Sequence, residues 1–158
     1  MTNYFINIFF FLFAFFGMEG VAWLTHKYVM HGFLWYLHKD HHQKEIKSVL
    51  EKNDSFFLIF SVPGIIGLLA GMMNNYNFFF WIGLGITVYG FAYFVVHDVF
   101  IHQRIKYLRN SDNVYLRAIR KAHKVHHKHL GKEEGECFGM LWVPFKYFIE
   151  ATKAKQPK

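Results

Sequence analysis

The chain has 158 residues, of which 53% are hydrophobic and 21% aromatic, and its formal net charge at pH 7 is +7. Its length is that of one domain, and its apolar share exceeds that of an ordinary soluble domain. High apolar content with a basic balance predicts a membrane protein with one charged side and argues against a nucleic-acid-binding protein. The single cysteine, Cys137, excludes an internal disulfide and a cysteine-based zinc or iron–sulfur site within one chain.

Three stretches are apolar enough to cross a bilayer, which takes about 20 helical residues. They cover roughly residues 4–24, 56–73 and 76–96. The first lacks the basic start and the small-residue cleavage site of a signal peptide, so we expect an uncleaved membrane helix.

The second and third spans are joined by a very short connection, which contains Asn74 and Asn75. This connection predicts a tight helical hairpin. Gly67 and Gly71 in the second span have the spacing of small residues at closely packed helix interfaces, so we expect the two helices of the hairpin to approach closely there.

The C-terminal third contains two further predicted elements. Residues 111–129 are typical of a helix outside the membrane, with Ser111 or Asp112 as its N-cap. Residues 138–150 are apolar but too short to span a bilayer, so we expect an interfacial or re-entrant segment in which Pro144 interrupts any helix.

The basic residues predict how the chain is oriented. All 18 lysines and arginines lie in residues 27–52, in residues 104–132 or from Lys146 onward. By the positive-inside rule the N-terminus and the hairpin turn are outside, and all eleven histidines are on the cytoplasmic side. The sequence therefore predicts an all-α integral membrane bundle of three to four transmembrane helices with a cytoplasmic histidine-rich helical cap, forming a single domain over residues 1–158.

Ten of the eleven histidines form two copies of one pattern, HxxxxH followed by HxxHH, in the cytoplasmic segments 26–52 and 97–130. Two octahedral ions with one open position each take about ten ligands, so the pattern predicts a site for two metal ions. Imidazole suits iron, zinc, copper and nickel, and ligand type alone leaves the metal open. We expect His129 not to be a ligand. The candidate ligands are His26, His31, His38, His41, His42, His97, His102, His123, His126 and His127.

The two spacings make different geometric demands. Residues at i, i+3 and i+4 adjoin on one side of a helix, so each HxxHH triplet is expected to converge on a metal. In the HxxxxH pairs, five residues turn an ideal helix by about 500°, which leaves the two rings about 140° apart. Either the helix is distorted there, or the two rings straddle a site between helices.

Four neighbours of the histidines are candidates for supporting roles. Glu19 lies in the first span, where a carboxylate must face the bundle interior, either as a polar contact between helices or as a group that supports the metal site or relays protons. Asp98 could orient a ligand by accepting the outer N–H of its imidazole, or be a surface charge. Tyr89 and Tyr93 could line a substrate channel or simply pack.

Four stretches carry a resemblance to a known family: "HKYVMHGFLWYLHKDHH", "VHDVFIHQR", "AHKVHHKH" and "GECFGMLWVP". They resemble the carotene hydroxylase branch of the membrane fatty acid hydroxylase superfamily, from about residue 20 to 148. The resemblance implies a non-haem di-iron monooxygenase in which the ten histidines hold two iron ions. It also implies that the enzyme uses O₂ to hydroxylate carbon 3 of the β-ionone rings of β-carotene, giving cryptoxanthin and zeaxanthin. Electrons would come from NAD(P)H through ferredoxin or a similar carrier.

Other functions stay open at this point. A related di-iron oxygenase would act on a fatty acid, a sterol or, as a ketolase, a carotenoid. A non-enzymatic haem-binding or metal-transporting membrane protein is a further class. Haem needs single histidines on facing helices, and a transporter needs polar ligands near mid-membrane, whereas these histidines gather at one face. A haem absorption band or metal flux in proteoliposomes would identify this class.

Overall fold

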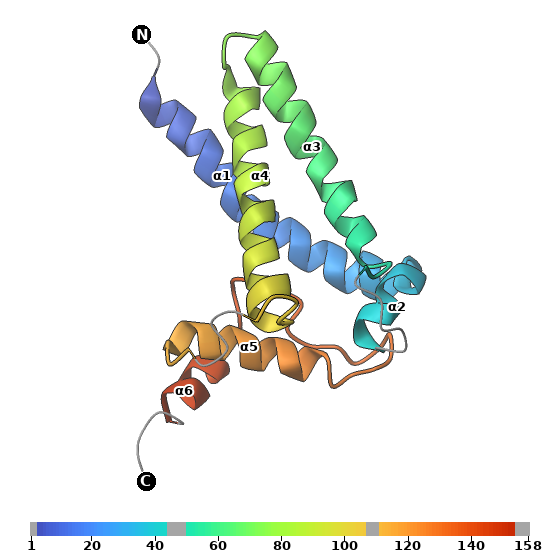
Figure 1. Ribbon diagram of the computed structural model, residues 1–158. Coiled ribbons are helices and arrows are strands. Elements are labelled where there is room, and N and C mark those ends of the chain that lie inside the picture. Colours follow the sequence, from blue (N-terminus) through green and yellow to red (C-terminus); the bar gives the residue numbers. More distant parts are fainter. Residues whose placement is uncertain (1–2, 44–49, 107–110, 154–158) are drawn as a thin grey trace.

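The protein is an assembly of helices in the computed structural model, which describes residues 3–43, 50–106 and 111–153. Three long helices form the part of the molecule that includes the N-terminus: α1 (Tyr4–Leu24), α3 (Asp54–Met73) and α4 (Phe78–Phe94) (Figure 1). With their continuations, all three are long and apolar enough to cross a membrane. The predicted all-α fold with three membrane-spanning candidates is confirmed.

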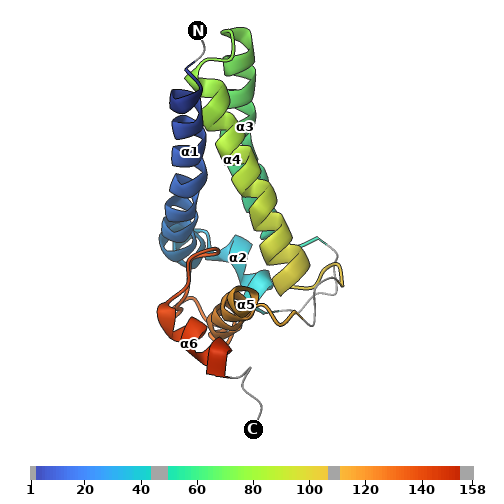
Figure 2. The ribbon, with the colours of Figure 1, turned by 90° about the vertical axis from the view of Figure 1, so that its left-hand side faces the viewer.

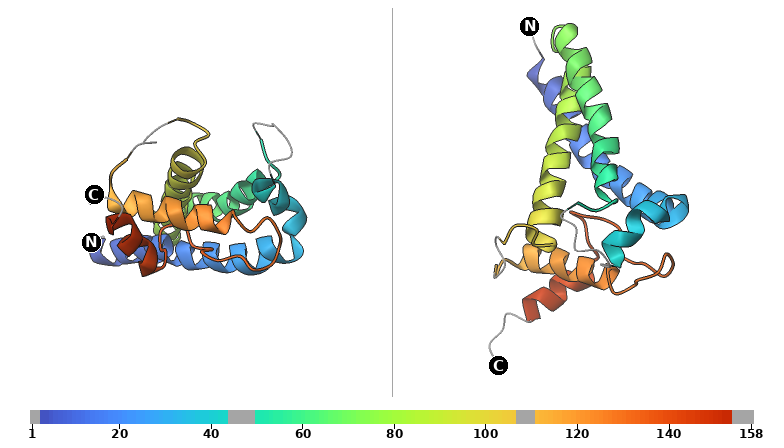
Figure 3. Two further views of the ribbon diagram at one scale, coloured as in Figure 1. Left: turned by 90° about the horizontal axis from the view of Figure 1, so that it is seen from below. Right: turned by 45° about the vertical axis from the view of Figure 1, so that its right-hand side comes forward.

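Three short helices lie at the end opposite the N-terminus: α2 (Trp35–His42), α5 (Val114–His126) and α6 (Phe145–Lys153) (Figure 1). Seen from below, α5 lies across the ends of the long helices (Figure 3, left). It packs against α6 through a small buried core of Ala118, Ala122, Tyr147 and Ala151. The short helices therefore form a cap on one end of the bundle.

Two details of the C-terminal third differ from the sequence-based prediction. The N-cap of α5 is Asn113, whose side chain accepts from the Leu116 N–H at 3.1 Å, and neither Ser111 nor Asp112 fills this role. Asparagine is as good an N-cap as either, so composition could not separate the three positions. Pro144 ends a non-helical stretch and immediately precedes α6, where the missing N–H of a proline costs no helical hydrogen bond.

The hairpin of α3 and α4 depends on glycines at its interface. A Cβ atom added at Gly67 would lie 2.9 Å from Gly83 Cα, and one added at Gly83 would lie 2.5 Å from Leu68 N. Such approaches of backbone to backbone leave no room for a side chain. The small-residue spacing in the sequence therefore marks a true helix contact, as predicted.

Replacing Gly83 by valine is expected to destabilise the protein by at least about 1–3 kcal/mol, because the new side chain must push α3 and α4 apart. The thermal unfolding midpoint of the detergent-solubilised protein measures this effect. Gly17→Val is the matched control, since a Cβ at Gly17 meets nothing within 4 Å. Equal midpoints for the two variants would contradict the close contact.

α4 is the central long helix. Its Gly85 faces the backbone of α1 near Phe11, and its Gly83 faces α3. α1 and α3 thus pack on α4 from two directions. Toward the cap, α4 diverges from α3 (Figure 1) and from α1 (Figure 2). Between them and α4 lies a cavity of about 400 Å³, which is described with the site below.

Candidate metal centre

The HxxxxH pairs lie where the long helices change their winding. α1 continues into a π-helical segment, η1 (Thr25–Phe33), and α4 into a second one, η2 (Val95–Ile101). In a π-helix each N–H bonds to the carbonyl five residues earlier, as His102 N does to His97 O at 2.9 Å. Residues five apart therefore share a face, and the first alternative from the sequence, a distorted helix, is correct.

Nine histidines gather into two groups, within each of which the ligand nitrogens all lie within 4.8 Å of one another. Eight of the nine side chains are buried, and His102 is half-buried. Each HxxxxH pair contributes both of its rings to one group. The first group is His26, His31, His38, His42 and His126, and the second group is His41, His97, His102 and His123.

The structure corrects the expectation that each HxxHH triplet converges on one metal. His38 and His42 face the first group, whereas His41 faces the second. Positions i and i+4 lie about 40° apart around a helix, and i+3 lies about 100° from i+4, so the i+3 ring points to the neighbouring group. In α5 the same rule sends His126 to the first group and His123 to the second.

The tenth histidine, His127, lies beside the second group. Its ring centroid is 4.6 Å from that of His123 and 4.9 Å from that of His102, and also 4.5 Å from that of His42. Its Nε2 is buried and has no hydrogen-bond partner among the described residues. A buried nitrogen without a partner is costly unless it binds something. This nitrogen is therefore a candidate ligand atom.

Nitrogen–nitrogen distances fit metal coordination. Nε2 atoms face each other at 3.0 Å between His26 and His38 and at 2.9 Å between His102 and His123. A metal–nitrogen bond of about 2.1 Å places neighbouring octahedral ligands about 3.0 Å apart. The imidazole spacing therefore fits two ions.

The outer nitrogens of the first group fix its tautomers. All five Nδ1 atoms donate to carbonyl oxygens, for example His26 to Phe138 O at 3.0 Å and His38 to Asn53 Oδ1 at 2.6 Å. A carbonyl oxygen only accepts, so the ring proton is on Nδ1 and the Nε2 lone pair is free to bind a metal. The other three acceptors are the backbone oxygens of Lys132, His129 and Glu136, which accept from His31, His42 and His126.

The second group has charged neighbours. His41 Nδ1 lies 2.7 Å from Glu51 Oε2, and His97 Nδ1 lies 3.2 Å from Asp98 Oδ2. Arg104 joins these carboxylates, at 3.3 Å from Glu51 and 3.0 Å from Asp98. It also pairs with Asp54 at 2.8 Å.

Sequence reasoning considered only Asp98 among these partners and missed Glu51, Asn53 and Arg104. Two signals were present. Glu51, Asn53 and Asp54 form a polar cluster just before a membrane helix, and Arg104 closes the "HDVFIHQR" stretch. The pairing of Arg104 with the cluster about 50 positions earlier in the sequence is visible only in the folded structure.

Glu19 forms no hydrogen bond or ion pair with a histidine among the described residues. It is buried in the first long helix, where its Oε1 accepts from three consecutive backbone N–H groups, those of Met140, Leu141 and Trp142, at 2.8–3.0 Å. The Tyr89 hydroxyl donates to Oε2 at 2.7 Å. The carboxylate thus fastens the segment before α6 to α1 and α4.

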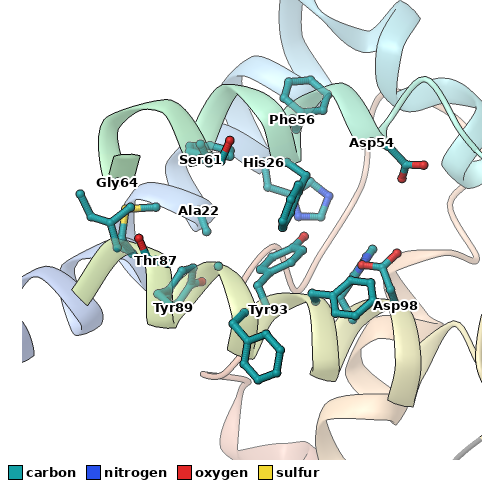
Figure 4. A pocket seen from close by; sticks show the side chains of 18 of the residues that line it. Ala22, His26, Asp54, Phe56, Ser61, Gly64, Thr87, Tyr89, Tyr93 and Asp98 are labelled. Carbon is teal, nitrogen blue, oxygen red and sulfur yellow. The ribbon is translucent and has the colours of Figure 1, made fainter. Parts of the chain in front are cut away.

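The cavity between the long helices reaches both histidine groups. His26 and His97 line it at the cap end, and Tyr89 and Tyr93 from α4 line one wall (Figure 4). The Tyr93 ring packs on His97, with centroids 5.0 Å apart. The remaining lining is mostly apolar and includes Phe56, Phe57 and Phe60 of α3 and Met18 and Ala22 of α1.

Burial keeps four of the candidate ligands neutral. Desolvation, aided by repulsion from neighbouring imidazoles, lowers the pKa of His42 to about 4 and that of His126 to about 3. The pKa values of His38 and His127 fall to about 2 for the same reason. Neutral imidazole is the form that binds metals.

Acidification below pH 6.5 is expected to destabilise the metal-free protein. An unfolded histidine has a pKa near 6.5, so between about pH 6.5 and 4 the unfolded chain binds more protons than the folded one. Stability therefore falls as pH falls through this window. Thermal unfolding of chelator-treated protein at pH 7.5, 6 and 5 measures the effect, and a midpoint that rises on acidification would contradict it.

The sequence is similar to those of several known proteins. Residues 11–148 match the fatty acid hydroxylase family. A beta-carotene hydroxylase from Pantoea ananas is 38% identical over 136 residues, which cover 86% of this chain and 77% of that protein. One from Paracoccus sp. (strain N81106 / MBIC 01143) is 38% identical, covering 80% of this chain and 78% of that protein.

A chloroplastic beta-carotene 3-hydroxylase from Gentiana lutea is 37% identical over 81% of this chain and 40% of its own length. No solved structure matches the chain. The family match covers most of the sequence, including both histidine groups and the Glu19-bound segment. The chain belongs to the fatty acid hydroxylase family.

Proposed function

We propose that this protein is a membrane di-iron oxygenase that hydroxylates carbon 3 of the β-ionone rings of β-carotene, by way of cryptoxanthin to zeaxanthin. The observation that carries the proposal is an apolar cavity that ends at two groups of buried histidines, in a chain similar to beta-carotene hydroxylases. The similarity favours a carotenoid hydroxylase over a sterol oxygenase, a ketolase, a haem protein or a transporter.

The proposed ligands of the first ion are His26, His31, His38, His42 and His126. The proposed ligands of the second ion are His97, His102, His123, His127 and His41. Each ion thus has both histidines of one HxxxxH pair and the first and last histidines of one HxxHH triplet. Its fifth ligand is the middle histidine of the other HxxHH triplet. Iron bound there would supply the activation of O₂. The chain's own part is to present neutral Nε2 atoms, to keep bulk water away and to hold one substrate carbon near the ions.

The cavity favours a lipophilic substrate that enters from the bilayer. Its volume of about 400 Å³ is at the lower end of the range for drug-sized ligands. We infer that it takes one end ring of the carotenoid while the polyene lies between α1 and α3. Phe56 and Phe60 then contact one side of the ring, and Tyr93 contacts the other beside His97.

The orientation and the electron donor belong to the same proposal. The positions of the lysines and arginines favour a cytoplasmic cap and an N-terminus outside. A second cleft, of about 380 Å³, reaches His102, His123 and His127 from the cap and has Lys124 at its edge. We propose that a ferredoxin-type carrier with an acidic face, itself reduced from NAD(P)H, delivers electrons there.

Expression in β-carotene-producing cells tests the function. Chromatography of the pigments should show cryptoxanthin and zeaxanthin with the wild type and only β-carotene with His41→Ala. A product with a ring carbonyl would instead identify a ketolase. Unchanged pigment despite folded, iron-loaded protein would refute the carotene proposal.

A further inference from the structure

The two histidine groups differ in what accepts their outward N–H groups. In the first group all five acceptors are neutral carbonyl oxygens, four from the backbone and one from Asn53. In the second group, His41 and His97 face the carboxylates of Glu51 and Asp98. Neither the HxxxxH nor the HxxHH spacing distinguishes the two halves, so this difference comes from the fold.

The surroundings of the second group increase the contrast. Among the described residues, three carboxylates, those of Glu51, Asp54 and Asp98, pair with the guanidinium of Arg104. Arg104 holds Glu51 and Asp98 in place. Among the described residues, two second-group rings thus pair with carboxylates, whereas no first-group ring forms a hydrogen bond or an ion pair with a side-chain carboxylate.

We propose that the two metal positions are chemically unequal: the ion of the second group binds more tightly and has the lower reduction potential. A carboxylate that accepts the outer N–H of an imidazole makes the inner nitrogen a stronger donor and orients the ring. Negative charge close to the ion further stabilises its more oxidised state. This inference rests on the proposed two-iron centre but not on carotene as its substrate.

A consequence concerns the half-reduced centre, in which one of the two iron ions is reduced and the other is oxidised. When the centre holds one Fe(II) and one Fe(III), the Fe(II) occupies the first group, behind which the acceptors are neutral. Arg104, Glu51 and Asp98 are positioning residues in this scheme, because they act through His41 and His97 and touch no reacting atom.

The test uses the purified full chain loaded anaerobically with ⁵⁷Fe(II). Chelator competition gives the affinity of each ion, and Mössbauer spectra during a redox titration give the oxidation state of each. The wild type should show two affinities, two oxidation steps and a mixed-valent intermediate with one kind of Fe(II). Glu51→Gln should weaken the tighter ion by about 10–100-fold and bring the two steps closer by raising the lower potential.

Two further variants sharpen the test. Asn53→Asp places a carboxylate behind His38 of the first group and should also bring the steps closer, but by lowering the higher potential. Glu150→Gln is the matched control: its exposed carboxylate pairs with Lys121, and Glu150 is not among the acceptors named for either histidine group. This variant should leave both ions unchanged.

The proposal fails if the wild-type ions bind and titrate alike, or if Glu51→Gln affects both ions equally or neither. Should Glu51→Gln not fold, Asp98→Asn measures the same effect at His97, and Asn53→Asp tests it from the opposite side. The function is tested separately, since unequal iron sites without carotene conversion would refute the substrate proposal and leave this inference standing.

Discussion

Replacing His126 by alanine is expected to abolish formation of cryptoxanthin and zeaxanthin and to release iron from the first group. His126 is fully buried, and its Nε2 lies 3.3 Å from that of His31. Its ring also packs on His26 and His42, with centroids 4.5 and 4.7 Å away. Losing the supporting partner of a ligand costs about 10–100-fold in metal affinity, so losing a ligand itself should cost more.

Pigment analysis and iron content per chain measure the two effects. His129→Ala is the matched control, because the His129 side chain joins neither group and the substitution keeps the backbone oxygen that accepts from His42. This variant should keep both iron ions and wild-type conversion. A His126→Ala protein that retains two ions and full activity would rule out His126 as a ligand.

The sequence was sufficient for the parts of the fold that depend on local periodicity and composition. The lengths of the apolar stretches located the three long helices, and Gly67 and Gly71 marked the hairpin contact. The histidine spacings identified the rings that gather, because a repeated pattern that uses ten of the eleven histidines rarely arises by chance. These features are encoded in neighbouring residues, so no knowledge of tertiary contacts is needed.

The division of the histidines between two groups could not be predicted from the spacing of residues along the sequence. An ideal helix puts His26 and His31 on different faces, and only the π-helical winding at the ends of α1 and α4 reverses this result. The rings that it brings together also contact remote segments, as His26 does by donating to Phe138 O. Glu51 and Arg104 are likewise 53 positions apart in the sequence, and they form their ion pair only in the folded chain.

The role of Glu19 shows the same limit in a single residue. The sequence required this carboxylate to face the bundle interior but left its partner open. Its partners are the Tyr89 hydroxyl and three backbone N–H groups in the 140–142 segment, and no side-chain pattern reveals the backbone groups. The segment adjoins Phe138, which lines the cavity and whose carbonyl oxygen accepts from His26. We therefore expect Glu19 to act on the metal site through the backbone of this segment.

Replacing Glu19 by leucine is expected to lower stability by several kcal/mol and activity by more than about 10-fold, since each buried N–H without an acceptor costs about 1–3 kcal/mol. The released segment should also free His26 Nδ1 and weaken iron binding in the first group. Hydrogen exchange should show faster exchange of the Met140, Leu141 and Trp142 amides, alongside iron content and pigment conversion.

Two milder variants separate the contributions of the carboxylate. Tyr89→Phe removes only the hydroxyl that donates to Oε2 and should cost about 1 kcal/mol while the three amides stay protected. Glu19→Gln keeps an oxygen that accepts from the amides but loses the negative charge. The protection of the three amides from hydrogen exchange should therefore be intermediate in this variant. If Glu19→Leu left these amides as protected as in the wild type, the 140–142 segment would be held by other contacts, and Glu19 would have no route to His26.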